Sequence, residues 1–313
     1  MSATATVRVA ERSRPAVDTE RGHRIRLRLL YLVAIVSNLA LFIYGFDYYK
    51  LSALDRPFSP KHHMLRPSGP IGLYLGFVGV GLFIGIFLYP IRKHWAWLGQ
   101  IGKTRHWLDI HVLMGLTAPL IIAFHSTLKF KGIAGMAFWI MFAVSASGVV
   151  GRYLYAQIPR RVTTAELTMK ELQELQENLC QELASHKLLP ESDLKSLLRL
   201  PNAQQVGRLP IPIALVYMMI LDIARKFGVA RLRRHASGES FKTFFGFVPS
   251  QHRELEKAIH AAAEQAALSK RLLFLSRSQK VFHLWHVVHK PFSYAFAVLA
   301  LMHIGLQFVL GYF

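Results

Sequence analysis

The segment HVLMGLTAPLIIAFH, residues 111–125, carries two histidines fourteen residues apart at the ends of an apolar run, and HKPFSYAFAVLALMH, residues 289–303, repeats this spacing. An ionisable side chain inside a membrane is costly, so each of these histidines is a candidate functional residue. Fourteen residues of α-helix rise about 21 Å and bring the side chain back to nearly the same face. Each segment therefore predicts a membrane helix with two histidines on one face, one near each side of the bilayer.

The distribution of apolar residues predicts the fold class. Hydrophobic residues make up 52% of the 313 residues, and they are gathered into runs. A run of about 20 apolar residues is long enough to cross the hydrocarbon core of a bilayer. Five such runs are present: residues 26–48, 70–91, 107–128, 133–156 and 281–310. We therefore expect an all-α polytopic membrane protein with five spans. Its expected parts are a disordered basic tail over 1–25, spans one to four over 26–156, a cytoplasmic helical insert over 157–280 and span five over 281–313.

The formal net charge of +20 at pH 7 is distributed as a topology signal. Seven arginines lie in the first 28 residues, and more Lys and Arg gather in residues 92–106 and in the insert, whereas nothing charged follows the last span. Cytoplasmic loops carry the excess of Lys and Arg, so this distribution predicts a cytoplasmic N-terminus in a bacterial inner membrane. The positive charge suits contact with anionic membrane lipid and gives no reason to expect nucleic acid as a partner.

The number of cysteines limits which cofactor sites this chain can form. The one cysteine, Cys180, excludes a disulfide framework, a cysteine-ligated zinc site and an iron–sulfur cluster built from this chain alone.

In the insert, the sequence predicts a capped amphipathic helix from Thr163 and another helix over 252–275. The apolar run 211–223 is too short to cross a bilayer comfortably and is expected at the membrane interface. We expect the insert to be a membrane-hugging cap or a docking platform for a redox partner.

The equal spacing on spans three and five predicts two pairs of histidines. The two spans run in the same direction under this topology, so His111 is expected to face His289 on the cytoplasmic side. His125 is then expected to face His303 on the outer side. Two imidazoles that face each other across a helical bundle are typical axial ligands of a low-spin haem iron. The pairs therefore predict two b-type haems with bis-histidine ligation, at two depths of the membrane.

Residues around the histidines are compatible with a flat macrocycle. Gly115 lies one turn from His111, and the small residues within 145–151 leave room on span four. Aromatic rings are available to pack on porphyrin edges, namely Phe124, Phe292, Tyr294 and Phe296. Arg152 is expected to pair with a haem propionate, or else to extend to the membrane surface as a snorkelling side chain.

Other interpretations of these histidines stay open. His283, His286 and His289 have the i, i+3 spacing of metal ligands, although no HExxH motif or nearby carboxylate accompanies them. Membrane histidines also serve proton-relay transporters. At the cytoplasmic boundary, aromatic side chains are expected to form an interfacial belt, and a quinone pocket is the alternative at the same place. A quinone would then be a second cofactor, and the residues concerned are His94, His106, His283, Trp95, Trp97, Trp107 and Trp285.

The paired His-x13-His spacing resembles the transmembrane domain of the ferric reductase and NADPH oxidase superfamily, and more loosely other four-helix b-type cytochromes. The resemblance implies that His111, His125, His289 and His303 are the haem ligands. Enzymes of that family continue into flavin- and NADPH-binding domains, whereas this sequence ends at Phe313. We therefore expect an electron-transfer subunit, not itself catalytic, of an oxidoreductase complex. Its partner is expected to be a soluble iron–sulfur, flavin or cytochrome c protein, and its acceptor a protein or a quinone. A quinol-oxidising or ferric-reducing enzyme and a haem-free transporter or assembly scaffold are the alternatives.

Overall fold

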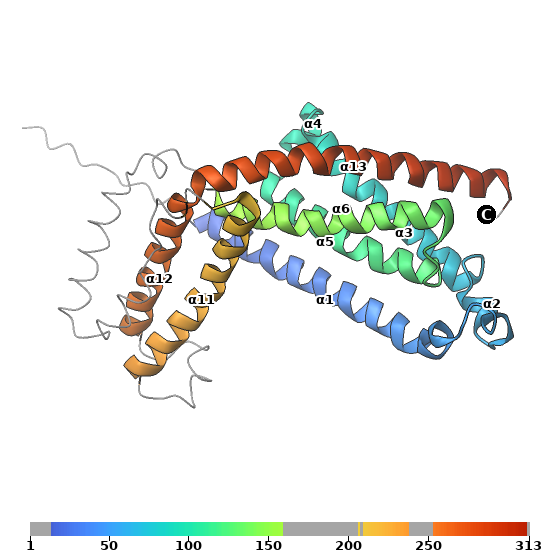
Figure 1. Ribbon diagram of the computed structural model, residues 1–313, viewed down its shortest axis with the longest axis horizontal. Helices are drawn as coiled ribbons and strands as arrows, with labels where there is room; N and C mark the ends of the chain where they lie inside the picture. Colours follow the sequence, from blue (N-terminus) through green and yellow to red (C-terminus); the bar gives the residue numbers. More distant parts are fainter. Residues whose placement is uncertain (1–13, 159–205, 207–208, 238–252, 312–313) are drawn as a thin grey trace, which may run out of the picture. The chain divides into compact units, whose positions relative to one another are not determined.

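The computed structural model describes residues 14–158, 206, 209–237 and 253–311. Its regular elements are all helices, and no strand occurs within these ranges, which confirms the all-α fold. Five helices are long and apolar enough to cross a membrane, as the sequence predicts. They belong to α1 (Arg14–Lys50), α3 (Pro70–Arg92), α5 (Thr104–His125), α6 (Gly132–Gln157) and α13 (Leu275–Val309) (Figure 1). The other described helices are η1 (Arg56–Phe58), α2 (His62–Leu65), α4 (Ala96–Gln100), α11 (Ile211–Ser237) and α12 (Arg253–Leu273).

The chain divides into two compact units. The first unit comprises Met1–Val150 and Val288–Phe313, and the second comprises Gly151–Val287. Within the first unit, α1, α5 and the C-terminal part of α13 run in one direction, while α3 and α6 run in the opposite direction (Figure 1). The parallel course predicted for spans three and five is therefore present in the structure.

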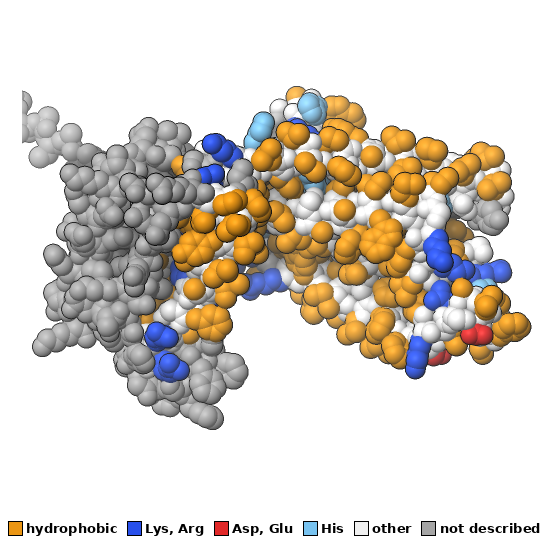
Figure 2. Space-filling view, viewed as in Figure 1, with side chains coloured by type: hydrophobic (Ala, Val, Ile, Leu, Met, Phe, Trp, Pro, Cys, Tyr) orange, Lys and Arg blue, Asp and Glu red, His pale blue; other side chains and the backbone are white. Residues whose placement is uncertain are grey.

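The outer surface of the spans is apolar, as a lipid-facing surface must be. Val33 of α1 is 63% exposed and Val298 of α13 is 57% exposed, and many large hydrophobic side chains on these helices are similarly exposed. Figure 2 shows hydrophobic side chains covering the visible face of these spans, with Lys and Arg confined mainly to the helix ends. The chain is an integral membrane protein by this criterion, because a soluble helix keeps polar residues on its outer face.

The helix α1 begins at Arg14, within the range 1–25 where the sequence predicts a disordered tail. Contacts with another helix hold this extension in place. The ring of His23 stacks on that of His106 of α5, with centroids 3.6 Å apart, and its Nε2 lies 3.2 Å from a carboxylate oxygen of the buried Asp109. Local composition does not reveal such partners, because they lie in a segment far along the chain. Residues 1–13 lie outside the described ranges.

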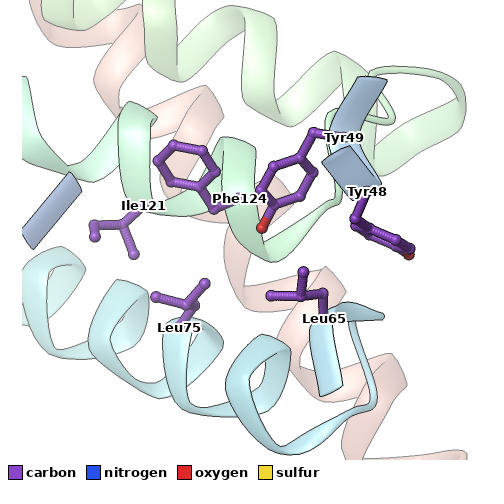
Figure 3. Packing of buried hydrophobic residues seen from close by; sticks show 6 residues of the cluster. All are labelled: Tyr48, Tyr49, Leu65, Leu75, Ile121 and Phe124. Atoms are coloured by element: carbon purple, nitrogen blue, oxygen red, sulfur yellow. The ribbon is translucent and has the colours of Figure 1, made fainter. Parts of the chain in front are cut away.

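Close packing of α3 on α5 forms the centre of the first unit. Gly79 of α3 leaves space for Ile122 of α5, since a Cβ at Gly79 would lie 2.4 Å from Ile122 Cδ1. Small residues of this kind allow membrane helices to approach closely. One end of this interface is a buried cluster at the ends of α1, α2, α3 and α5 (Figure 3), made of Tyr48, Tyr49, Leu65, Leu75, Ile121 and Phe124.

A buried arginine fixes the loops at the same end. The guanidinium of Arg56 donates hydrogen bonds to the carbonyls of Thr127, Tyr49 (3.0 Å) and Leu51 (3.1 Å). Thr127 and Leu128 follow the end of α5 with φ of 52° and 59°, a region that non-glycine residues rarely occupy. The Arg56 bond to the Thr127 carbonyl therefore stabilises a strained turn that comes directly after His125 and Ser126.

The second unit contains the described part of the insert. Its helices α11 and α12 pack together. Arg233 makes a bidentate ion pair with Glu256, with Nε 2.7 Å from Oε1 and Nη2 2.9 Å from Oε2. Asp222 accepts a hydrogen bond from Tyr153 at 2.7 Å and pairs with Lys270. Burial opposes ionisation of Asp222, but these two donors hold its pKa below the usual value.

The insert differs in part from its predicted helices. The helix predicted over 252–275 is confirmed by α12. The run 211–223 forms the start of α11, which continues to Ser237 and is not one of the candidate spans of the described residues. The helix predicted from Thr163 lies outside the described residues.

Candidate functional site

The first unit contains all four predicted haem ligands, on two helices. α5 carries His111 and His125, and α13 carries His289 and His303, and each of these side chains is half-buried. The imidazoles of His125 and His303 are close enough to interact electrostatically. We call this pair the His125 level.

The other two histidines lie at the opposite end of the same helices, and we call them the His111 level. Lys93, one residue after α3, interacts electrostatically both with His111 and with Lys290, the neighbour of His289. The ring of Tyr89 on α3 lies 5.1 Å from that of His111, and the Lys93 amine lies 5.1 Å from the Tyr89 ring centroid. Partial burial and the charge of Lys290 lower the pKa of Lys93. These contacts place cationic groups beside the His111 level.

Backbone carbonyls of α3 orient both histidines of α5. His111 Nδ1 lies 3.0 Å from the carbonyl oxygen of Ile86, and His125 Nδ1 lies 2.8 Å from that of Gly72. A carbonyl can only accept, so Nδ1 must carry the proton in both rings. In a neutral imidazole the lone pair is then on Nε2, the usual state of a histidine that binds a metal. The two carbonyls are themselves fourteen residues apart, which matches the histidine spacing on the antiparallel neighbour.

A hydroxyl of α6 fixes the third ring in the same tautomer. Ser147 Oγ lies 2.8 Å from the Val144 carbonyl and 2.8 Å from His289 Nδ1. The hydroxyl has one proton, which it donates to the carbonyl, so it accepts from the Nδ1–H of His289. The lone pair of His289 is therefore also on Nε2. The ring of His303 makes no hydrogen bond among the described residues.

Two of the small residues have open space beside their Cα atoms. A Cβ at Gly115 would meet nothing within 4 Å, and one at Gly148 would only touch His289 Cε1 at 4.0 Å. α5 is packed closely against α3 but not against α13. The open positions at Gly115 and Gly148 and the chemistry of the donor atoms are compatible with a flat macrocycle near the His111 level.

The other side chains that were expected to contact a porphyrin, four aromatic residues and Arg152, differ in their exposure and packing. Phe292 and Tyr294 are 51% and 60% exposed, and Phe296 packs against the ring of Phe83. Phe124 is instead buried against Tyr49, with ring centroids 5.4 Å apart, which leaves it little surface for a porphyrin. Arg152 belongs to the second unit, so its contact with a propionate stays a prediction.

The alternative sites receive little support. Among the described residues, no group of three or more His, Cys, Asp or Glu could hold a metal ion. His106, a member of the candidate quinone pocket, is stacked on His23 and lies 3.4 Å from Glu20, so its ring takes part in packing α1 on α5. Trp107 donates to the Ile101 carbonyl at 2.8 Å. A quinone at this boundary stays a prediction.

The four histidines and Gly115 can be picked out from the sequence, but the groups that orient the rings cannot. Ser147 is one of the small residues within 145–151, and the carbonyls of Gly72 and Ile86 belong to residues with no functional side chain. Comparisons of the chain with protein-family models, with curated proteins and with solved structures find no match. Any functional assignment therefore depends on the contacts described above.

Proposed function

We propose that this chain is a membrane diheme cytochrome b subunit that passes electrons across the membrane between a redox partner and a protein or quinone acceptor. His111 and His289 would hold one b-type haem, and His125 and His303 the other. One observation carries the proposal: at least three of the four rings have Nδ1 in a hydrogen bond that places the lone pair of the neutral imidazole on Nε2. Nδ1 of His286 bonds a carbonyl of its own helix. The rings of His111, His125 and His289 instead bond acceptors on a neighbouring helix, at the matching positions of two parallel helices.

The chain's own groups have defined tasks in this function. When bound, haem supplies a one-electron iron couple that bis-histidine ligation keeps low-spin. The Ile86 carbonyl and the Ser147 hydroxyl hold the rings of the His111 level in one tautomer and orientation, and they increase the electron donation of the imidazoles. Lys93 and Lys290 provide positive charge near the same level, which suits propionate carboxylates. The apolar spans exclude water and keep the local dielectric low.

The proposal extends to the cellular setting. The Arg-rich N-terminal region and the basic insert support a cytoplasmic N-terminus in a bacterial inner membrane. Other subunits of a redox complex would supply and accept the electrons, and anionic lipid would contact the basic helix ends.

A visible spectrum of the purified chain tests the proposal. We expect a reduced-minus-oxidised spectrum of a low-spin b-type cytochrome, and two haems per chain in a pyridine haemochrome assay. A colourless protein that cannot be reconstituted with haem would favour the transporter or scaffold alternative. Turnover of a quinol or a ferric chelate by the isolated haem-loaded chain would instead favour an enzyme in its own right.

A further inference from the structure

A proline in α3 changes the hydrogen bonding of the carbonyl that orients His111. Pro90 lies inside α3, and the residue four positions before it is Ile86. In an α-helix the carbonyl of residue i accepts from the N–H of residue i+4. Proline has no N–H, so the Ile86 carbonyl loses its helical partner. A buried carbonyl without a partner is costly, and a donor from outside the helix has to replace the missing one.

The donor that replaces it is the ring of His111, whose Nδ1 lies 3.0 Å from the Ile86 oxygen. We propose that Pro90 is a positioning residue: by withholding its own N–H, it reserves the Ile86 carbonyl for His111 and so holds that ring with Nε2 free. The redox consequence of this role rests on the proposed function, whereas the hydrogen bond itself does not.

A second proline in the bundle shows the same replacement without a candidate ligand. Pro119 lies inside α5, and the carbonyl that it releases is that of Gly115. Ser145 Oγ of α6 donates to that carbonyl. At Pro90 and Pro119, a side chain of a facing helix donates to the carbonyl that the proline releases, and at Pro90 that side chain is one of the four histidines. Pro291 of α13 is a further proline inside a span and is not part of this comparison.

The His125 level lacks this feature, which makes it an internal reference. The carbonyl that accepts from His125 is that of Gly72, and residue 76 is a glycine with an ordinary N–H. That N–H can share the Gly72 oxygen, whereas the corresponding i+4 N–H is missing at Ile86 because residue 90 is a proline. The His111 Nδ1–H therefore does not share its acceptor with an i+4 N–H, and a stronger acceptor makes the imidazole a better electron donor to a metal.

The test restores the missing donor with Pro90→Ala. In the haem-loaded protein we expect one of the two midpoint potentials to rise, with the reduction equilibrium of that haem changed up to about tenfold, or about 59 mV for one electron. In protein labelled with 15N-histidine and kept in the ferrous state, the His111 Nδ1–H signal, identified by its loss in His111→Ala, should shift. Pro70→Ala is the matched control, because Pro70 is the first residue of the same helix and releases no helical carbonyl.

The outcomes separate this inference from the proposed function. If the wild type binds no haem, the proposed function fails, and the 15N signal of His111 still tests the hydrogen bond. Unchanged potentials and an unchanged His111 signal in Pro90→Ala would overturn the inference, and so would an equal shift in Pro70→Ala. If Pro90→Ala does not fold, a wild-type His111 that lacks a proton on Nδ1 would overturn it as well.

Discussion

The two histidine levels are built from the same spacing but are held in different ways. At the His111 level both rings have an acceptor for Nδ1, one from α3 and one from α6. At the His125 level one ring has such an acceptor, and His303 has none among the described residues. This level lies near the hydrogen bond from Arg56 to the Thr127 carbonyl, two residues after His125. The backbone of Gly76 also packs closely on the His125 ring, since a Cβ at Gly76 would lie 3.0 Å from His125 Cε1.

Two levels with the same ligand types need not give two sites with the same properties. Hydrogen bonds to Nδ1 adjust the basicity of a metal-binding imidazole, whereas close packing mainly fixes where the ring can lie. We therefore expect the two haems to differ in how they respond to substitution. Loss of a hydrogen bond should act on the potential at the His111 level, and loss of space should act on ligation at the His125 level.

Removing the ligands themselves should have the largest effect. We expect His111→Ala to reduce the haem content from two per chain to one, and His125→Ala to remove the other haem, because each level supplies its own pair of ligands. The two variants should therefore lose different components of the reduced-minus-oxidised spectrum at low temperature. His286→Ala is the control, because the His286 ring bonds to the carbonyl of Phe282 on its own helix, and it should keep both haems. Loss of the same component in both variants would contradict two separate levels.

The sequence predicts only part of the difference between the two histidine levels. Hydropathy predicted the spans and the spacing predicted the histidine faces, because both depend on the helical period alone. The orienting groups depend on how helices pack, so the carbonyls of Ile86 and Gly72 could not be identified from local pattern. Pro90 was an available signal, since a proline inside a span marks a released carbonyl four residues before it. The ordered start of α1 was missed for the same reason, as His23 and Asp109 are far apart in the chain.

Filling the space at Gly76 should weaken the His125 level selectively. In Gly76→Ala the new methyl group would lie 3.0 Å from His125 Cε1 and 3.1 Å from Nδ1, so the ring has to move and its bond to the Gly72 carbonyl weakens. Overpacking of this kind costs about 1–3 kcal/mol. We expect lower thermal stability and partial loss of one haem, measured by a melting curve and by haem stoichiometry. Gly81→Ala on the same helix meets nothing within 4 Å and should retain both haems. Equal haem loss in the two variants would show that any alanine in place of a glycine of α3 disturbs haem binding, and that the effect is not specific to the contact with His125.

Removing the Ser147 hydroxyl should have the smallest effect and should act on the His111 level. Ser147→Ala deletes the acceptor of His289 Nδ1–H while leaving the ring in place, so we expect both haems to remain and one midpoint potential to rise, with an equilibrium change of about tenfold or less. Ser147→Thr keeps a hydroxyl and should restore the wild-type value. Ser126→Ala is the matched control, since Ser126 also donates to the carbonyl three residues before it, at 3.0 Å, and its hydroxyl contacts no histidine ring among the described residues. A redox titration that finds the same shift in Ser126→Ala, or no shift in Ser147→Ala, would show that the hydroxyl only stabilises its own helix and that the two levels do not differ in the way described.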